Sequence, residues 1–166
     1  MSGDIARVTK VRPAGGRALL VRFDGDRRDH EVDITGLIAR SVHFAPLMND
    51  AETFAHVEIV EDGLGVAWSV QTKWGRLDVS ASTLQRISEE QKPMTGEDFA
   101  HWRTALGLSL TESAMVLGVG RRTIMGYLKK DELPAVVAIA CRALARDKHL
   151  LAAHYVPGRK VARRTA

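Results

Sequence analysis

The spacing of apolar residues changes once along this chain, and that change limits the possible folds more than any other feature. Up to residue 92, apolar residues alternate with polar ones or form short runs, which is the pattern of β-strands. After the connector "EEQKPMTGED" (89–98) they recur every three to four positions, as in amphipathic helices. We therefore expect an α+β fold class: a small antiparallel domain (1–92), an all-α bundle (93–156) and a basic flexible tail (157–166).

The first domain opens with a pattern typical of a β-hairpin. An apolar run at 18–23 is followed by an Asp-Gly-Asp turn at 24–26 and by alternating residues at 30–34. An edge strand is expected over 5–11, ending at Pro13, because proline cannot donate a ladder hydrogen bond. The sequence thus predicts three antiparallel strands here.

A second hairpin is expected further along the same domain. Strands at 57–59 and 66–68 flank a turn that contains two glycines. Between the two hairpins the sequence predicts one or two helical turns at 35–41 and a bend at 44–47.

The second domain carries the apolar spacing of at least four helices. The inner faces are marked by Phe99, Trp102 and Leu106; by Leu110, Ala114 and Leu117; by Ile124, Tyr127 and Leu128; and by Val136, Val137, Ala140 and Leu144. A last helix is expected around "DKHLLAAHY" (147–155). Helix starts are signalled by Ser80 or Ser82, by Thr95 with Asp98, by Ser109 with Glu112 and by Pro134 in a first turn.

The segment "GLSLTESAMVLGVGRRTIMGYLKK" (107–130) places Gly118 and Gly120 directly before two arginines. A dinucleotide-binding loop needs a strand before its first glycine and a third glycine where this chain has Thr123. A P-loop needs four residues between its glycines. The spacing excludes both loops and favours a bend between two short helices.

The residues of this bend have distinct expected roles. Gly118 suits the left-handed position that ends helix 110–117, and Gly120 suits the cap of helix 121–129. Val119 is expected to plug the crevice between the two helices. A helix that follows such a bend can enter the major groove of double-stranded DNA with its first turn leading.

"WRTALGLSLTESAMVLGVGRRTIMGYLK" (102–129) resembles the Cro/C1-type (lambda repressor-like) helix-turn-helix family, and the likeness extends over about residues 97–146. The family pattern runs Leu-Gly-Leu-Ser, an acid-containing helix, Leu-Gly-Val-Ser and Arg-x-Thr-Ile. This chain has Leu110 where the family usually has glutamine and Gly120 where it has a cap serine. Met125 and Gly126 stand where its base-reading residues are often polar.

The resemblance implies a sequence-specific DNA-binding protein, a bacterial transcriptional regulator. One such module makes few contacts with DNA, so we expect a homodimer. The implied DNA-binding residues are Arg121, Arg122, Thr123, Met125, Gly126, Lys129, Lys130, Ser109 and Thr111. Three roles stay open. Thr123 contacts a phosphate or packs between helices, and Lys129 and Lys130 contact phosphates or complement a helix C-terminus. The tail arginines (Arg159, Arg163 and Arg164) track the DNA backbone or remain solvated.

The first domain also resembles a known grouping. The stretches "DGDRRDHEVDITGLI", "FAPLMNDAETFAHVEIVEDG" and "LDVSASTL" are similar to the small bacterial domain of unknown function 2442, over about residues 5–88. That resemblance implies an α+β fold and no established activity. We expect this domain to supply dimerisation or to sense a partner or ligand. Trp68 is expected in its core, and Trp74 is its candidate surface residue.

Charge divides the chain at the same boundary. Residues 1–92 hold 12 Lys and Arg against 14 Asp and Glu, whereas residues 93–166 hold 12 against 6. A basic second half favours a polyanionic partner. Charged residues at the start exclude a signal peptide, and no apolar run could span a membrane, so a cytoplasmic protein is expected.

The sequence shows no group of residues typical of a catalytic or metal-binding site. The six histidines lack metal-ligand spacing, and Cys141 lies in an apolar stretch where burial is expected. We expect no catalytic residue, metal or cofactor, and hence no enzyme. The rival hypothesis is an antitoxin-like adaptor whose N-terminal domain binds a partner protein, since Leu110, Met125 and Gly126 make the DNA-facing surface unusually apolar.

Overall fold

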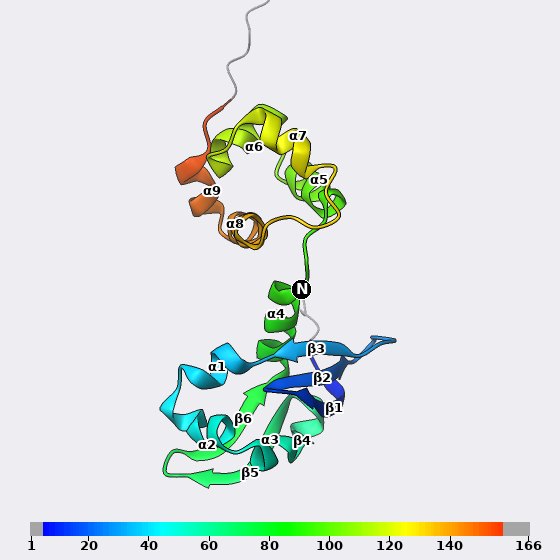
Figure 1. Ribbon diagram of the computed structural model, residues 1–166, viewed down its shortest axis with the longest axis vertical. Coiled ribbons are helices and arrows are strands. Elements are labelled where there is room, and N and C mark those ends of the chain that lie inside the picture. Colours follow the sequence, from blue (N-terminus) through cyan, green and yellow to red (C-terminus); the bar gives the residue numbers. More distant parts are fainter. Residues whose placement is uncertain (1–4, 158–166) are drawn as a thin grey trace, which may run out of the picture. The chain divides into compact units, whose positions relative to one another are not determined.

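The computed structural model describes residues 5–157, and these form an α+β protein, as the sequence predicts (Figure 1). The chain divides into two compact units, Met1–Gln91, here called the N-terminal unit, and Lys92–Ala166, here called the helical unit. Every described strand belongs to the N-terminal unit.

Two antiparallel sheets of three strands make up the N-terminal unit. The first has the order β1-β2-β3 and the second the order β4-β5-β6. The strands are β1 Val8–Gly15, β2 Ala18–Phe23, β3 His30–Asp33, β4 Val57–Val60, β5 Gly65–Thr72 and β6 Gly75–Ser80. Both predicted hairpins are therefore present. β6 was not predicted, although Leu77 and Val79 alternate with exposed residues along it.

β1 continues past Pro13, where the sequence predicted its end. Pro13 pairs in register with Leu19 of β2, and a register shift follows between Pro13 and Gly15. β1 is an edge strand of its sheet, so one side of it has no ladder partner. The missing N–H of a proline is tolerated on such a strand.

Short helices connect the two sheets: α1 Thr35–Ala39, η1 Val42–Phe44, α2 Ala45–Asn49 and α3 Ala51–Ala55. A further short helix, η2 Glu61–Gly63, lies between β4 and β5 of the second sheet. The predicted bend at 44–47 is wrong, because α2 begins there. Pro46 in its first turn has a backbone angle already suited to a helix. Asp50 then starts α3, since its carboxylate accepts a hydrogen bond from the Glu52 N–H at 2.9 Å.

The core of the N-terminal unit is built around Trp68, which is fully buried, as predicted. Its indole N–H donates to the Phe54 carbonyl at 2.8 Å, and the two rings lie 5.8 Å apart. α4 Ala81–Gln91 closes the unit against β3, β5 and β6. Ser80 rather than Ser82 caps it, because the Ser80 hydroxyl accepts from the Thr83 N–H at 3.2 Å.

The helical unit consists of α5 Gly96–Ala105, α6 Leu110–Leu117, α7 Arg121–Tyr127, α8 Ala135–Arg146 and α9 Lys148–His154. Both predicted capping boxes form: Thr95 with Asp98 starts α5, and Ser109 with Glu112 starts α6. Pro134 lies at the N-cap of α8, just outside the first turn predicted for it.

Aromatic rings fill the core of this unit. Phe99 stacks on Trp102 with centroids 5.3 Å apart and meets the edge of Tyr127 at 5.8 Å. The Trp102 indole donates to the Cys141 carbonyl at 2.8 Å, which joins α5 to α8. Burial raises the pKa of the Cys141 thiol to about 12, so this cysteine is a core residue, as expected.

The start of α5 is held against the chain that follows α7. The Gly96 N–H donates to the Lys130 carbonyl at 2.8 Å, and the Leu133 N–H donates to the Met94 carbonyl at 2.7 Å. A Cβ on Gly96 would lie 2.6 Å from the Leu128 carbonyl oxygen. Only glycine allows the two backbones to approach this closely.

We predict that Gly96→Ala destabilises the helical unit by about 1–3 kcal/mol, because the added methyl group must displace backbone rather than a flexible side chain. Gly36→Ala is the matched control, since a Cβ there meets no atom within 4 Å. Urea unfolding of the full chain, followed by circular dichroism, measures both. Equal midpoints for the two variants would contradict the close approach.

A second prediction concerns pH. Hydrogen bonds from the Thr95 backbone N–H and hydroxyl lower the pKa of Asp98 below its usual 3.8. The stabilisation from ionised Asp98 is therefore complete above that pH and is lost as the pH falls through the lowered pKa. Asp98→Asn should cost about 1 kcal/mol near neutral pH and much less at pH ~2. Glu97→Gln, in the same helical turn but outside the capping box, should show no such pH dependence in urea unfolding.

Candidate nucleic-acid interface

α6 and α7 are two short helices joined by a sharp turn at residues 118–120. Gly118 adopts the left-handed conformation, with φ 66° and ψ 28°. The Gly118 N–H donates to the Met115 carbonyl at 3.2 Å, and the Val119 N–H donates to the Ala114 carbonyl at 2.9 Å. These bonds satisfy the last carbonyls of α6 and turn the chain, as the sequence predicts.

The inner side of this turn is apolar. Ile124 of α7 is fully buried, and Val119 and Leu128 are partly buried against the same core. Leu110, which stands where the resembled family has glutamine, also packs partly against this core. Its position therefore contributes to packing, which accounts for the apolar residue.

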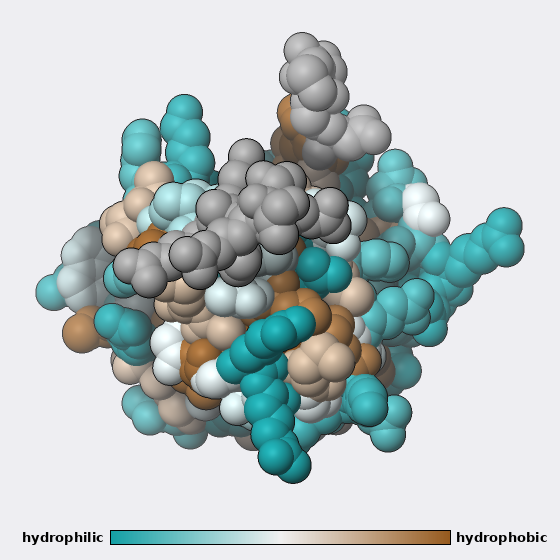
Figure 2. All heavy atoms as spheres, turned by 90° about the horizontal axis from the view of Figure 1, so that it is seen from above, coloured by the Kyte–Doolittle hydropathy of each residue, from teal (hydrophilic) through white to brown (hydrophobic). Residues whose placement is uncertain are grey.

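The outer side of α7 is basic at its start and apolar in its middle. Arg121, Arg122, Thr123 and Gly126 are exposed, and Met125 is 44% exposed. Within the described residues, neither guanidinium has an ion pair or a hydrogen bond. Figure 2 views the molecule from the side of α6 and α7, and hydrophilic and hydrophobic side chains lie next to each other on the face that it shows.

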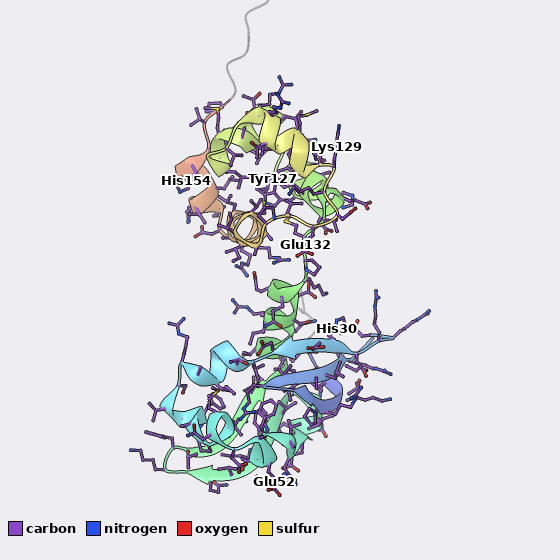
Figure 3. The ribbon with its side chains drawn as sticks, in the orientation of Figure 1. His30, Glu52, Tyr127, Lys129, Glu132 and His154 are labelled. Carbon is purple, nitrogen blue, oxygen red and sulfur yellow. The ribbon has the colours of Figure 1, made fainter. Side chains whose placement is uncertain are left out.

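α7 ends at Tyr127, two residues earlier than the predicted helix 121–129. The Lys129 and Lys130 N–H groups donate to the Gly126 and Tyr127 carbonyls, which tightens the last turn. Lys129 and Lys130 are both exposed, and Lys129 projects away from the unit (Figure 3). Tyr127 points inward against Phe99, as expected for a residue at the edge of the core (Figure 3).

The start of α6 carries the other two predicted site residues. Thr111 is exposed. The Ser109 hydroxyl accepts from the Glu112 N–H at 3.2 Å, while its own backbone N–H donates to the Glu112 carboxylate at 2.8 Å. Ser109 is thus engaged as a helix cap and retains its hydroxyl hydrogen for a further acceptor.

A contact that the sequence did not predict joins α6 to the chain after α9. The Tyr155 hydroxyl donates to the second oxygen of the Glu112 carboxylate at 2.7 Å. This hydrogen bond raises the pKa of Tyr155. No local sequence signal links two residues so far apart in the chain. Arg159, Arg163 and Arg164 lie outside the described residues.

Other kinds of site find little support in the described part of the chain. It contains no group of three or more His, Cys, Asp or Glu that could hold a metal. None of its helices has the length and apolarity to cross a membrane. A groove of about 430 Å³ between β1 and β4 is lined by Lys10, Val11, Arg12, Leu20, Asp29, Val57, Glu58 and Ile59. This lining contains no serine, cysteine or histidine to form a nucleophile–base pair.

Comparisons with known proteins give one structural likeness. No protein-family model matches the chain, and no curated protein matches it. A crystal structure named "Putative DNA Binding Protein NE0471", from Nitrosomonas europaea, is 26% identical, covers 84% of this chain and 86% of its own, and has a TM-score of 0.44. A TM-score below 0.5 does not establish a shared fold, so the function proposed below rests on this chain's own residues.

We predict opposite effects for two alanine substitutions near the turn. Gly118→Ala should destabilise the helical unit by about 1–2 kcal/mol, because a side chain disfavours the left-handed conformation. Gly126→Ala should stabilise it by about 0.5–1 kcal/mol, because Gly126 is helical and a Cβ there meets nothing within 4 Å. Urea unfolding by circular dichroism tests the pair. A stabilising Gly118→Ala would show that the turn is not left-handed in solution.

Proposed function

We propose that this protein is a sequence-specific DNA-binding protein, a bacterial transcriptional regulator rather than an enzyme, in which α7 enters the major groove of double-stranded DNA. The observation that carries the proposal is the pair Arg121 and Arg122. Both lie exposed in the first turn of a helix that follows a left-handed glycine turn, and no described residue neutralises them. Two adjacent free guanidiniums at a helix start match guanine edges and phosphates.

The remaining residues of the interface are proposed to make the other contacts with the DNA. Thr123 and Thr111 contact phosphates, as do Lys129 and Lys130 beyond the end of α7. Met125 contacts a thymine methyl group, and Gly126 permits close approach of the helix to the DNA. Ser109 donates its remaining hydroxyl hydrogen to a phosphate. Base discrimination then depends on the two arginines, because methionine and glycine offer no bidentate hydrogen bonds.

A single module of this size makes few contacts, so we propose a homodimer that reads half-sites about 34 Å apart. The N-terminal unit supplies the dimer surface or senses a partner or ligand. In this proposal the protein is cytoplasmic and binds neither a cofactor nor a metal.

An antitoxin-like adaptor is the second candidate. The exposed methionines Met115 and Met125 favour it, because such flexible apolar side chains also suit a protein partner. An adaptor would co-purify with a neighbouring-gene product and would not retard DNA even at low salt.

The test compares the variant Arg121→Gln/Arg122→Gln with the wild type. We expect the affinity for duplexes selected from a random pool to fall by about 10- to 100-fold, and the slope of log K against log salt to weaken by ~1 for each phosphate that the variant no longer neutralises. Arg27→Gln/Arg28→Gln is the matched control, since it removes two adjacent exposed arginines from the N-terminal unit. Fluorescence anisotropy at several salt concentrations measures both.

Equal affinities for the wild type and the α7 variant would remove Arg121 and Arg122 from the interface. An equal loss of DNA affinity in the Arg27→Gln/Arg28→Gln control would show that the effect comes from net charge and not from the position of Arg121 and Arg122. The absence of any duplex binding at low salt would overturn the proposed function and favour the adaptor.

A further inference from the structure

The chain that follows α9 is held against the start of α6. α9 ends at His154 and contacts α6, and Tyr155 comes directly after it (Figure 1). The Tyr155 N–H donates to the Leu151 carbonyl at 2.8 Å, and the Tyr155 hydroxyl donates to the Glu112 carboxylate at 2.7 Å. Leu150 and Leu151 pack partly against the core of the helical unit. Tyr155 is thus fixed by a packed helix on one side and by α6 on the other.

Glu112, which accepts the Tyr155 hydrogen bond, lies in the first turn of α6 among the proposed phosphate contacts. It follows Thr111 in the chain, and its other carboxylate oxygen accepts from the Ser109 N–H at 2.8 Å. Thr111 and Ser109 are both proposed to contact DNA phosphates. The chain after α9 therefore leaves the helical unit at the end of α6 where DNA is proposed to bind.

The sequence beyond this point is strongly basic. Residues 156–166 hold Arg159, Lys160, Arg163 and Arg164 and no acid. An extended chain advances about 3.3–3.6 Å per residue, and each strand of a DNA duplex carries one phosphate about every 3.4 Å along the helix axis. A chain that starts beside α6 can therefore bring several of these cations to neighbouring phosphates of one strand.

We infer that Tyr155 is a positioning residue, which directs the basic tail (157–166) onto the DNA phosphates beside the start of α6. The inference rests on the proposed DNA binding by α6 and α7. The tail adds affinity without selecting bases, because the phosphates are the same in every DNA sequence. The hydrogen bond from Tyr155 to Glu112 lowers the entropy cost of this contact, since the point where the tail begins is already fixed.

Two other roles for the same residues lead to different results. If the Tyr155 hydroxyl only stabilised α6, its removal would weaken DNA binding to the same extent with and without the tail cations. If the tail cations paired with acidic residues of the N-terminal unit, their removal would not weaken DNA binding. The position of Tyr155 favours DNA over such acids, because Tyr155 places the start of the tail beside the proposed phosphate contacts of α6.

The first experiment neutralises the tail in the full-length protein. The variant Arg159→Gln/Lys160→Gln/Arg163→Gln/Arg164→Gln is called the tail variant. It should bind selected duplexes and random duplexes more weakly by the same factor, about tenfold or more at low salt, in fluorescence anisotropy. The slope of log K against log salt should weaken by up to about 3.6, since each neutralised phosphate contributes ~0.9.

A control matched in charge removes four exposed cations from the N-terminal unit, as Lys10→Gln/Arg12→Gln/Arg27→Gln/Arg28→Gln. The net charge of this control equals that of the tail variant. We expect its affinity for both kinds of duplex to stay close to that of the wild type, because these residues have no place in the proposed DNA contacts.

The second experiment tests the hydrogen bond with a double-mutant cycle. Tyr155→Phe removes the hydroxyl and keeps the ring. It should weaken duplex binding about two- to fivefold in the full-length protein and leave the affinity of the tail variant unchanged. Urea unfolding should show the same change of midpoint in both backgrounds, so that stability does not account for the difference. Tyr127→Phe, which removes the hydroxyl of a tyrosine that points inward, should leave both affinities unchanged.

Three results would overturn the inference while the proposed function stands. One is equal affinity of the wild type and the tail variant for duplexes that the α7 variant binds weakly. Another is an equal loss in the tail variant and its control, which would show an effect of net charge. The third is the same effect of Tyr155→Phe with and without the tail cations, which would leave Tyr155 a structural role only. A wild type that binds no duplex at low salt would overturn the proposed function as well.

Discussion

The left-handed conformation of Gly118 is the constraint on which the candidate interface depends. It ends α6 while the last carbonyls are still satisfied, and it lets α7 begin after only two more residues. With that angle fixed, burial of Ile124 sets the rotation of α7 about its axis. Arg122, two positions before Ile124, then lies on the opposite side of the helix, and Arg121 is exposed as the first residue of α7. If one helix continued straight through residue 118, Arg121 and Arg122 would lie in the middle of that helix and not in an exposed first turn.

Arginine serves two different purposes in the two units. In the N-terminal unit several guanidiniums are structural: Arg22 pairs with the Asp29 carboxylate at 2.7 Å, and Arg17 donates to the Met48 carbonyl at 2.7 Å. In α7 the guanidiniums have no partner among the described residues. Net charge alone does not distinguish these roles. The unequal charge of the two halves is informative because, within the described residues, two arginines of the basic half, Arg121 and Arg122, are unpaired at the start of α7.

Much of the fold follows from signals that act within a few residues. The α+β class, both hairpins, the two capping boxes and the left-handed turn were predicted from alternation, cap residues and glycine placement. The errors have different causes, some local and some set by the sheet. β1 passes through Pro13 because its outer edge has no ladder partner, and residues 44–47 form a helix because Pro46 favours one. α7 stops two residues early, and the Lys129 and Lys130 N–H groups close its end by donating to the Gly126 and Tyr127 carbonyls.

Local sequence is sufficient to specify where α6 ends and α7 begins, and which residues of α7 are polar or apolar. These are properties of short stretches of backbone and of a helical period. The folded chain was needed to establish that the arginines are unpaired, that Tyr155 binds Glu112 and that His43 supports Trp74. Each of these observations depends on where side chains from distant parts of the chain lie relative to one another. The packing of whole helices and strands sets those positions, and no local sequence pattern specifies that packing.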